Sequence, residues 1–137
     1  MAKLIVDGNG AIFGRMASFV SKELLKGNFV DIINCEKIIV SGDKKNFVEK
    51  ILRKRRMGRG SSLKGPKYIR KGDRLVKRMI RGMLPRDRMK GKEAFKRLKC
   101  YDGLGNFKEE ELKNISSFKH NELKKYSTIK EIMEILK

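Results

Sequence analysis

The first part of the chain alternates short apolar runs with one amphipathic stretch. Residues 4–6 and 29–35 are dense apolar runs with β-branched side chains, a pattern that is typical of buried strands. Between them, the apolar residues of 13–24 recur at helical spacing, and Gly27 marks the expected end of that helix. Strands that alternate with helices predict an α/β fold in layers, with a mostly parallel sheet.

A further apolar run, at residues 37–40, follows the second one closely. Too few residues separate the two for a crossover helix, so they form either one long bent strand or two directly consecutive strands. Residues 41–43 then predict a turn and the start of a helix. Residues 47–52 supply the apolar face of that helix, and basic residues cover its other face.

The chain changes character in its middle. Residues 57–72, called the arm below, are rich in glycine and basic residues and have little periodicity, so we expect them to be poorly ordered alone in water. Helical spacing resumes over 75–83, and Pro85 is expected to stop that helix. A short helix over 90–98 and a last strand at 99–101 are predicted to follow.

The C-terminal part has weaker patterns. Residues 102–126 lack clear periodicity, which predicts an irregular tail. Thr128 and Glu131 have capping-box spacing, so a C-terminal helix is expected over 127–137. A length of 137 residues predicts a single domain over 1–137, and no internal repeat at a fixed period is visible. No apolar run approaches the ~20 residues of a membrane span and no secretory signal is visible, so a cytoplasmic protein is expected.

Charge is the most uneven property of the sequence. The formal net charge is +19, and residues 50–99, called the basic stretch below, hold 21 Lys or Arg and 3 acidic residues. The remaining residues hold 14 basic and 13 acidic residues. Because like charges at this density repel one another, the basic stretch requires a polyanionic partner, most commonly a nucleic acid.

A solvated helix surface is the plainer interpretation of such a stretch. Solvated helices usually mix charges of both signs, since like charges four residues apart destabilise a helix. Here two predicted helices are apolar on one side and almost uniformly cationic on the other, which favours a surface for phosphates. Only Tyr68 offers a ring in the most basic part, and no zinc-finger or basic-zipper pattern occurs. These features favour folded RNA, with a DNA-compacting protein as another possible nucleic-acid binder.

The candidate RNA-binding residues are the cations of the two helices, the arm and the loop after Pro85. Arg53, Arg55 and Arg56 are all expected to face solvent, whereas Met83 and Leu84 are expected to pack rather than to contact RNA. The full set is Lys50, Arg53, Lys54, Arg55, Arg56, Arg59, Lys64, Lys67, Arg70, Lys71, Arg74, Lys77, Arg78, Arg81, Arg86, Arg88 and Lys90.

The exit of the second basic helix is expected to shape this surface. Residues 82–85 predict a tight turn that brings Arg81, Arg86 and Arg88 together. Guanidinium groups bind phosphates with two parallel hydrogen bonds and stack on exposed bases, so such a group suits RNA.

A glycine-rich turn near the N-terminus favours a different function. Gly8, Gly10 and Gly14 resemble a dinucleotide-binding turn, and Glu36 lies near the end of the second predicted strand. The alternative is therefore a small nucleotide- or NAD-binding enzyme that uses the Gly8–Gly14 turn. Tight packing of a strand on a helix demands the same glycines, and the chain has no catalytic motif. We therefore expect a structural turn, no enzyme activity, no catalytic residues and no cofactor.

The cysteines give no sign of a metal site. Cys35 and Cys100 lie far apart without metal-binding spacing, and His120 is the only histidine, so no metal ligands and a surface position for His120 are expected. Both cysteines are expected to be reduced, buried thiols with a packing role, although their number alone would permit a disulfide.

Residues 78–103 carry the most specific pattern in the chain. Gly82-Met83-Leu84-Pro85 leads through a basic spacer to Gly91, then to an apolar and basic helix and a short strand that ends at Tyr101 and Gly103. This pattern resembles the signature of the thirteenth large-subunit ribosomal protein family (L-thirteen). The segments 14–18 and 38–42 match the family as well, and residues 125–128 are similar to its archaeal and eukaryotic branch.

The resemblance, which covers nearly the full length, implies an α/β/α fold around a four-stranded parallel sheet. It also implies a structural constituent of the ribosome that binds large-subunit rRNA, supports subunit assembly and has no catalytic activity. The implied partners are large-subunit rRNA and neighbouring ribosomal proteins, with the protein present as a monomer within the cytoplasmic ribosome and without a membrane.

Overall fold

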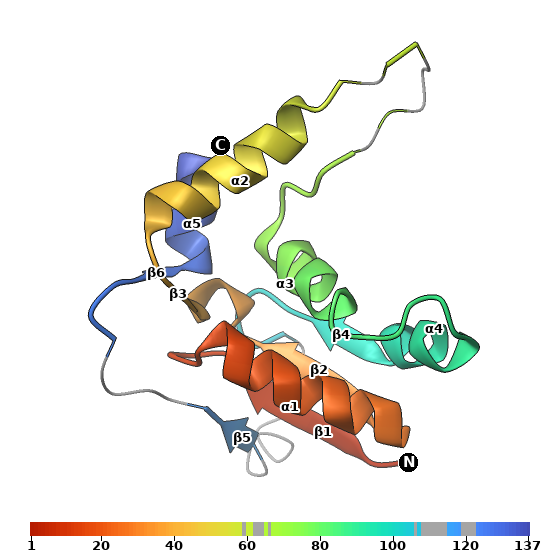
Figure 1. Ribbon diagram of the computed structural model, residues 1–137. Coiled ribbons are helices and arrows are strands. Elements are labelled where there is room, and N and C mark those ends of the chain that lie inside the picture. The colour runs from red at the N-terminus through yellow and green to blue at the C-terminus, as the bar shows by residue number, and fades with distance from the viewer. Residues whose placement is uncertain (59, 62–64, 66, 106, 108–114, 119–122) are drawn as a thin grey trace.

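The computed structural model describes residues 1–58, 60–61, 65, 67–105, 107, 115–118 and 123–137. Its main sheet has four strands in the order β4-β2-β1-β5, and every pair of neighbours is parallel (Figure 1). These strands are β1 (Lys3–Asp7), β2 (Phe29–Ile33), β4 (Leu98–Cys100) and β5 (Ile115–Ser117). The α/β class and the four-stranded, mostly parallel sheet are confirmed.

One face of the sheet carries the core beneath α1 (Phe13–Lys26). Val6 pairs with Ile32 and Val30 pairs with Leu98 in the strand register, so these side chains share a face. All four are fully buried in one cluster with the apolar stripe of α1, which consists of Met16, Ala17, Val20 and Leu24. Helical spacing therefore predicted the buried stripe of α1 correctly.

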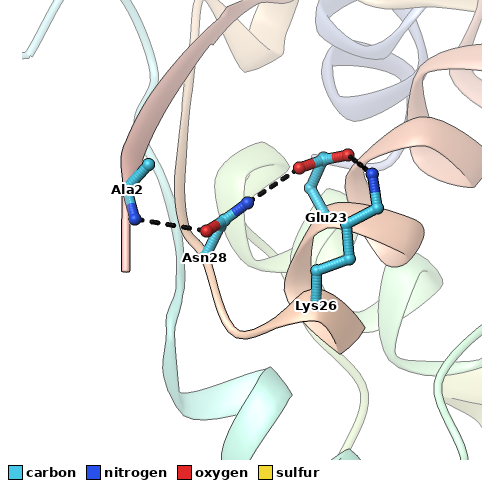
Figure 2. A network of polar contacts seen from close by, with 4 residues as sticks. All are labelled: Ala2, Glu23, Lys26 and Asn28. Atoms are coloured by element: carbon cyan, nitrogen blue, oxygen red, sulfur yellow. Dashed lines mark hydrogen bonds and ion pairs between the residues drawn. The ribbon is translucent and has the colours of Figure 1, made fainter.

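The C-terminal end of α1 is tied to the start of the sheet. Gly27 closes the helix in the left-handed conformation, with φ of 102°, as its position predicted. Figure 2 shows how Glu23 then accepts hydrogen bonds from Lys26 Nζ at 2.6 Å and from Asn28 Nδ2 at 2.8 Å, while Asn28 Oδ1 accepts one from the Ala2 amide. The two hydrogen bonds that Glu23 accepts lower the pKa of its carboxyl group, and the bond from Lys26 has the larger effect.

The apolar run at 37–40 forms a strand of its own after β2, which is the second of the two expected alternatives. Residues Cys35–Lys37 form a 3₁₀ turn (η1), and β3 (Ile39–Ser41) pairs antiparallel with β6 (Tyr126–Thr128) in a separate two-stranded sheet. The run is thus not part of one long bent strand but the next strand along the chain, in a sheet separate from that of β2. Asn34 is the physical reason, because its left-handed backbone (φ of 54°) ends β2 and its side chain donates to Asp7 Oδ1 at 2.9 Å.

Two helices begin at the caps that the sequence predicted. The carboxylate of Asp43 accepts the Lys45 amide at 3.0 Å and opens α2 (Lys44–Arg56). Thr128 Oγ1 accepts the Glu131 amide at 3.3 Å and opens α5 (Ile129–Ile135), which starts later than expected because Tyr126–Thr128 form β6. Glu131 turns to Lys44 at 3.1 Å, so α5 is also joined to α2.

The remaining helices are α3 (Gly72–Arg81) and α4 (Met89–Lys96). The α-helical part of α3 ends before the predicted boundary, and hydrogen-bonded turns carry the chain from Gly82 to Leu84. The tail was predicted to be irregular over 102–126, which is wrong at β5 and at the first residue of β6. His120 lies outside the described residues. Within the described part of the chain, no helix has the length and apolar character needed to cross a membrane.

Candidate nucleic-acid interface

The basic stretch runs through the end of α2, the arm, α3, α4 and β4. In Figure 1 the helices α2, α3 and α4 and the arm occupy the upper and right parts of the molecule, while β1 and β5 lie below. Most candidate side chains are exposed: Lys50, Arg53, Lys54, Arg56, Lys67, Arg70, Lys71, Arg74, Arg86, Arg88 and Lys90. Arg55, Lys77, Arg78 and Arg81 are half-buried, and Arg59 and Lys64 lie outside the described residues.

The described cations of the basic stretch form no ion pairs with described carboxylates. Among the described residues, the ion pairs are Lys3–Asp31, Lys26–Glu23 and Lys44–Glu131, and none of them uses a cation from residues 50–99. The positive charge of the described cations in the basic stretch is therefore not cancelled by carboxylates within the fold. An evenly scattered or internally paired set of cations would have argued against nucleic-acid binding.

Arg55 is the exception to the expected exposure. Its Nη1 donates to the Leu136 carbonyl at 2.6 Å and its Nη2 donates to the Ile69 carbonyl at 3.2 Å. Its Nε is buried and has no hydrogen-bond partner. The expectation that Arg55 faces solvent is wrong, because this guanidinium joins α2 to the end of α5 and to the arm.

A hollow lies where α2, the arm and the turn after α3 meet, and we call it the Tyr68 hollow. Its volume is about 460 Å³, and its cationic lining consists of Lys54, Arg78, Arg81 and Arg86. Tyr68 holds two of these cations, with Arg78 Cζ 4.6 Å and Lys54 Nζ 5.7 Å from the ring centroid. The sequence singled out Tyr68 only as a ring in a basic segment, whereas the structure makes it the centre of a cationic site.

The turn from Gly82 to Pro85 brings two of the three predicted arginines together. Arg81 and Arg86 both line the Tyr68 hollow, whereas Arg88 does not. Partial burial, together with the positive charges of Arg86 and Arg78, lowers the pKa of Arg81. Burial is the larger cause of this shift, and the neighbouring positive charges add to it.

The two apolar residues of this turn have different surroundings. Leu84 is buried in the core, as predicted, and its amide donates to the Arg81 carbonyl at 3.2 Å. Met83 is 44% exposed, so the expectation that it packs in the interior is wrong. Leu84 anchors the turn, and Met83 lies on its surface.

A second cationic hollow of about 350 Å³ lies on another side of α3. Arg74, Lys77 and Lys99 line it, and Lys77 Nζ lies 5.1 Å from the centroid of Phe95. Lys99 was not among the candidates derived from the sequence. Its position between Leu98 and Cys100 in a strand gave a usable signal, because alternation places it on the opposite face from its buried neighbour Leu98.

The glycine turn at the N-terminus is filled by the protein itself. A Cβ on Gly8 would lie 2.7 Å from Ile38 Cγ1 and 2.9 Å from the Ile33 carbonyl oxygen. The Gly8 amide donates to that same carbonyl, and the Gly10 amide donates to the Lys37 carbonyl. Gly8 therefore permits close packing of β1 on the end of β2, and the amides that would cradle a pyrophosphate are engaged.

The cysteines are free thiols that differ in burial. Cys35 is fully buried, as expected, and its thiol donates to the Ile32 carbonyl at 3.7 Å, whereas Cys100 is half-buried. A hydrogen bond with Cys100, followed by burial, raises the pKa of Cys35. Cys35 is therefore held as a neutral thiol, which suits a packing role.

A parallel α/β base with a closely packed glycine turn, together with exposed cations on α2 and α3, defines a basic α/β protein with a cationic surface. Residues 2–106 match the family model described as Ribosomal protein L13. The chain belongs to the ribosomal protein L13 family, in its archaeal-type branch, and is not an enzyme. The nucleotide-binding alternative is thereby set aside.

Relatives support the family over most of the chain. The chain is 43% identical over 106 residues to "Large ribosomal subunit protein uL13" of Methanopyrus kandleri, a match covering 77% of this chain and 65% of that protein. It is 34% identical over 136 residues to the protein of that name from Archaeoglobus fulgidus, covering 96% of this chain and 86% of the relative. The protein of that name from Methanococcus maripaludis is 36% identical over 135 residues, covering 97% and 96%.

Proposed function

We propose that this protein is a structural constituent of the large ribosomal subunit in the cytoplasm and binds its rRNA through the basic stretch. The single observation that carries the proposal is that no described cation of residues 50–99 forms an ion pair with a described acidic residue. Phosphates would supply the missing negative charges. The names of the relatives, which are large-subunit proteins, support the same assignment.

The contact surface comprises the exposed side of α2, the arm, α3 and the turn that leads to α4. The sheet and α1 serve as the rigid base, because their apolar residues form the buried core. Neighbouring ribosomal proteins are the further partners, and the protein supports assembly by fixing the RNA segments that it contacts. The described residues of the arm before α3 form no helix or strand, and such a segment suits the shape of folded RNA better than the readout of bases in a duplex groove.

Salt titration of RNA binding tests this function. The affinity for a folded rRNA fragment should fall on the order of a thousandfold or more between 50 and 200 mM salt, if six to ten phosphates are engaged. An affinity that hardly responds to salt would contradict the proposal. Equal affinity for the rRNA fragment and for duplex DNA at the same salt would favour a DNA-compacting protein instead.

A pair of double variants locates the contact surface. Arg53→Ala with Arg56→Ala removes two exposed cations from α2, and Arg15→Ala with Lys22→Ala removes two exposed cations from α1. Each phosphate contact contributes about one unit to the slope of log affinity against log salt. The α2 variant should therefore lose about two units of slope, while the α1 variant, which has the same net charge, should lose almost none. Equal losses would mean that the charge of the whole molecule, and not this surface, governs binding.

A further inference from the structure

We propose that the Tyr68 hollow binds one unstacked nucleotide of the RNA, with its phosphate on Arg81 and Arg86 and its base against Met79, Leu84 and Pro85. This inference rests on the proposed function and adds a ligand class and a geometry to one part of the surface. It predicts that the protein prefers an RNA segment with an unpaired nucleotide over a continuous duplex.

The size and lining of the hollow favour a nucleotide over a bare phosphate. A volume of about 460 Å³ falls within the range of roughly 300–1,000 Å³ that is usual for small-ligand pockets. Met79, Leu84 and Pro85 contribute apolar surface to its lining, which an inorganic anion would not use. A base within an A-form helix is stacked and paired, so only a nucleotide from a loop, bulge or end can enter.

The cations around the hollow divide into held and available groups. Arg78 and Lys54 lie over the ring of Tyr68, and Arg78 Nη1 also donates to the Lys67 carbonyl at 3.5 Å. Within the described part of the chain, the guanidinium groups of Arg81 and Arg86 have no hydrogen-bond acceptor. Tyr68 therefore holds two of the lining cations, whereas Arg81 and Arg86 offer two guanidinium groups for a phosphate.

Asp87 also lines the hollow and distinguishes a nucleotide from a simple anion. Its carboxylate repels phosphate and accepts hydrogen bonds only, so it requires an N–H donor from the ligand. Amino groups of adenine, cytosine and guanine supply such a donor, as in the pairing of acidic side chains with the cytosine amino group. Uracil offers a single N–H donor, at N3, and it is flanked by two carbonyl oxygens that a carboxylate repels, so the hollow should disfavour uridine.

Binding to matched RNA hairpins tests the inference. Two labelled hairpins would share one sequence, and one of them would carry a single unpaired adenosine opposite an otherwise continuous strand. Fluorescence anisotropy at fixed salt should show about tenfold tighter binding to the bulged hairpin, which corresponds to about 1.4 kcal/mol. Equal affinity for both hairpins would overturn the inference and leave the proposed function intact. Failure to bind either hairpin would contradict the inference and the proposed function together.

Two glutamine variants on one helix separate the hollow from general charge. Arg81 lines the hollow and Arg74 lies outside it, although both belong to α3. Arg81→Gln should abolish the preference for the bulged hairpin, while Arg74→Gln should weaken both hairpins by the same factor and keep the preference. Loss of the preference in both variants, or in neither, would contradict the assignment of the phosphate to Arg81.

The identity of the unpaired base tests the role of Asp87 without removing a cation. The native protein should bind an adenosine or cytidine bulge about tenfold more tightly than a uridine bulge, the size of one hydrogen bond to a charged group. Asp87→Asn should reduce this difference, because an amide can also donate to the uracil carbonyl. Equal binding of all bases by the native protein would rule out contact between Asp87 and the base. Because Asp87 is exposed, the variant is expected to keep the fold.

Discussion

Cations in the two halves of the molecule are held by different kinds of partner. In the half formed by the sheet and α1, Lys3 lies 3.7 Å from Asp31 and Lys26 lies 2.6 Å from Glu23, as Figure 2 shows for the second pair. In the basic stretch, Arg55 instead donates to carbonyl oxygens. Carbonyl groups fix a side chain without cancelling its charge. The basic stretch can thus be ordered and still remain cationic.

Aromatic rings and other carbonyl groups serve the same purpose elsewhere in the basic stretch. Arg97 Nη2 donates to the Leu24 carbonyl at 3.0 Å, and rings lie beneath Arg78, Lys54 and Lys77. The local net charge stays positive although several cations are positioned by contacts within the protein. This arrangement is what a protein needs if it must present preorganised cations to a polyanion.

The largest expected effect comes from a substitution at Gly91, where the backbone of α4 lies close to the backbone of Pro85 in the basic half. A Cβ on Gly91 would lie 2.0 Å from the Pro85 carbonyl oxygen, so α4 and the turn that carries Arg86 would have to separate. Gly91→Ala should lower the free energy of unfolding by at least about 3 kcal/mol, even though alanine favours a helix. Chemical denaturation followed by circular dichroism measures the change.

Gly14→Ala is the matched control for this substitution. Gly14 also lies in a helix, but in the sheet half, and a Cβ there would meet no atom within 4 Å. Its replacement should leave stability unchanged or raise it by up to about 1 kcal/mol. If the Gly91→Ala protein were as stable as the Gly14→Ala protein, the turn at Pro85 would be able to move away from α4 without loss of stability.

The next test compares Arg55 with Arg53, which lie on the same helix. Arg55 is expected to stabilise the fold, whereas Arg53 is expected to bind RNA. Arg55→Ala removes two hydrogen bonds from a charged donor and leaves the Leu136 and Ile69 carbonyls without it, so stability should fall by about 2 kcal/mol. Arg53→Ala, at an exposed position of α2, should change stability by less than about 0.5 kcal/mol. Thermal unfolding at fixed salt compares the two, and equal stability would deny Arg55 its structural role.

Much of the fold was predictable because the responsible signals are local. Helical spacing gave the buried stripe of α1, Asp43 and Thr128 gave the two caps, and Gly27 gave a helix end. The two-stranded sheet was not predictable in the same way. Its strands β3 and β6 lie far apart in the chain, and the change of sheet depends on the left-handed conformation of Asn34. β5 also depends on pairing with a distant strand, β1.

The candidate site shows the same division between local and tertiary signals. The location of the positive charge followed from composition, but the meeting of α2, the arm and the Gly82–Pro85 turn around Tyr68 is a tertiary event. Arg55 was misplaced despite an available signal. It follows the buried residues Val48 and Ile51 at spacings of seven and four, which put it on the inward side of α2. Position along the helix, and not charge, decides where this side chain lies.

The smallest expected effect concerns acidic residues where the two halves meet. Burial, followed by the charge of Asp73, raises the pKa of Asp102, and Glu36 contributes in the same direction. The charged form of Asp102 is thus less favourable in the folded protein than in the unfolded chain. Asp102→Asn should therefore stabilise the protein slightly at neutral pH, since the amide keeps an oxygen that can accept the Asp73 amide.

The pH dependence gives this prediction its sign. Above the raised pKa of the folded state, native Asp102 carries its full unfavourable charge, so the advantage of Asp102→Asn should be complete there. As the pH falls, the folded native protein takes up the proton first and gains stability relative to the variant, and below the pKa of the unfolded chain the advantage should vanish. Denaturation curves of both proteins from neutral to acidic pH measure this convergence. A variant that is less stable at neutral pH would show that the carboxylate is needed at the start of α3, where acids, unlike cations, find a favourable helix end.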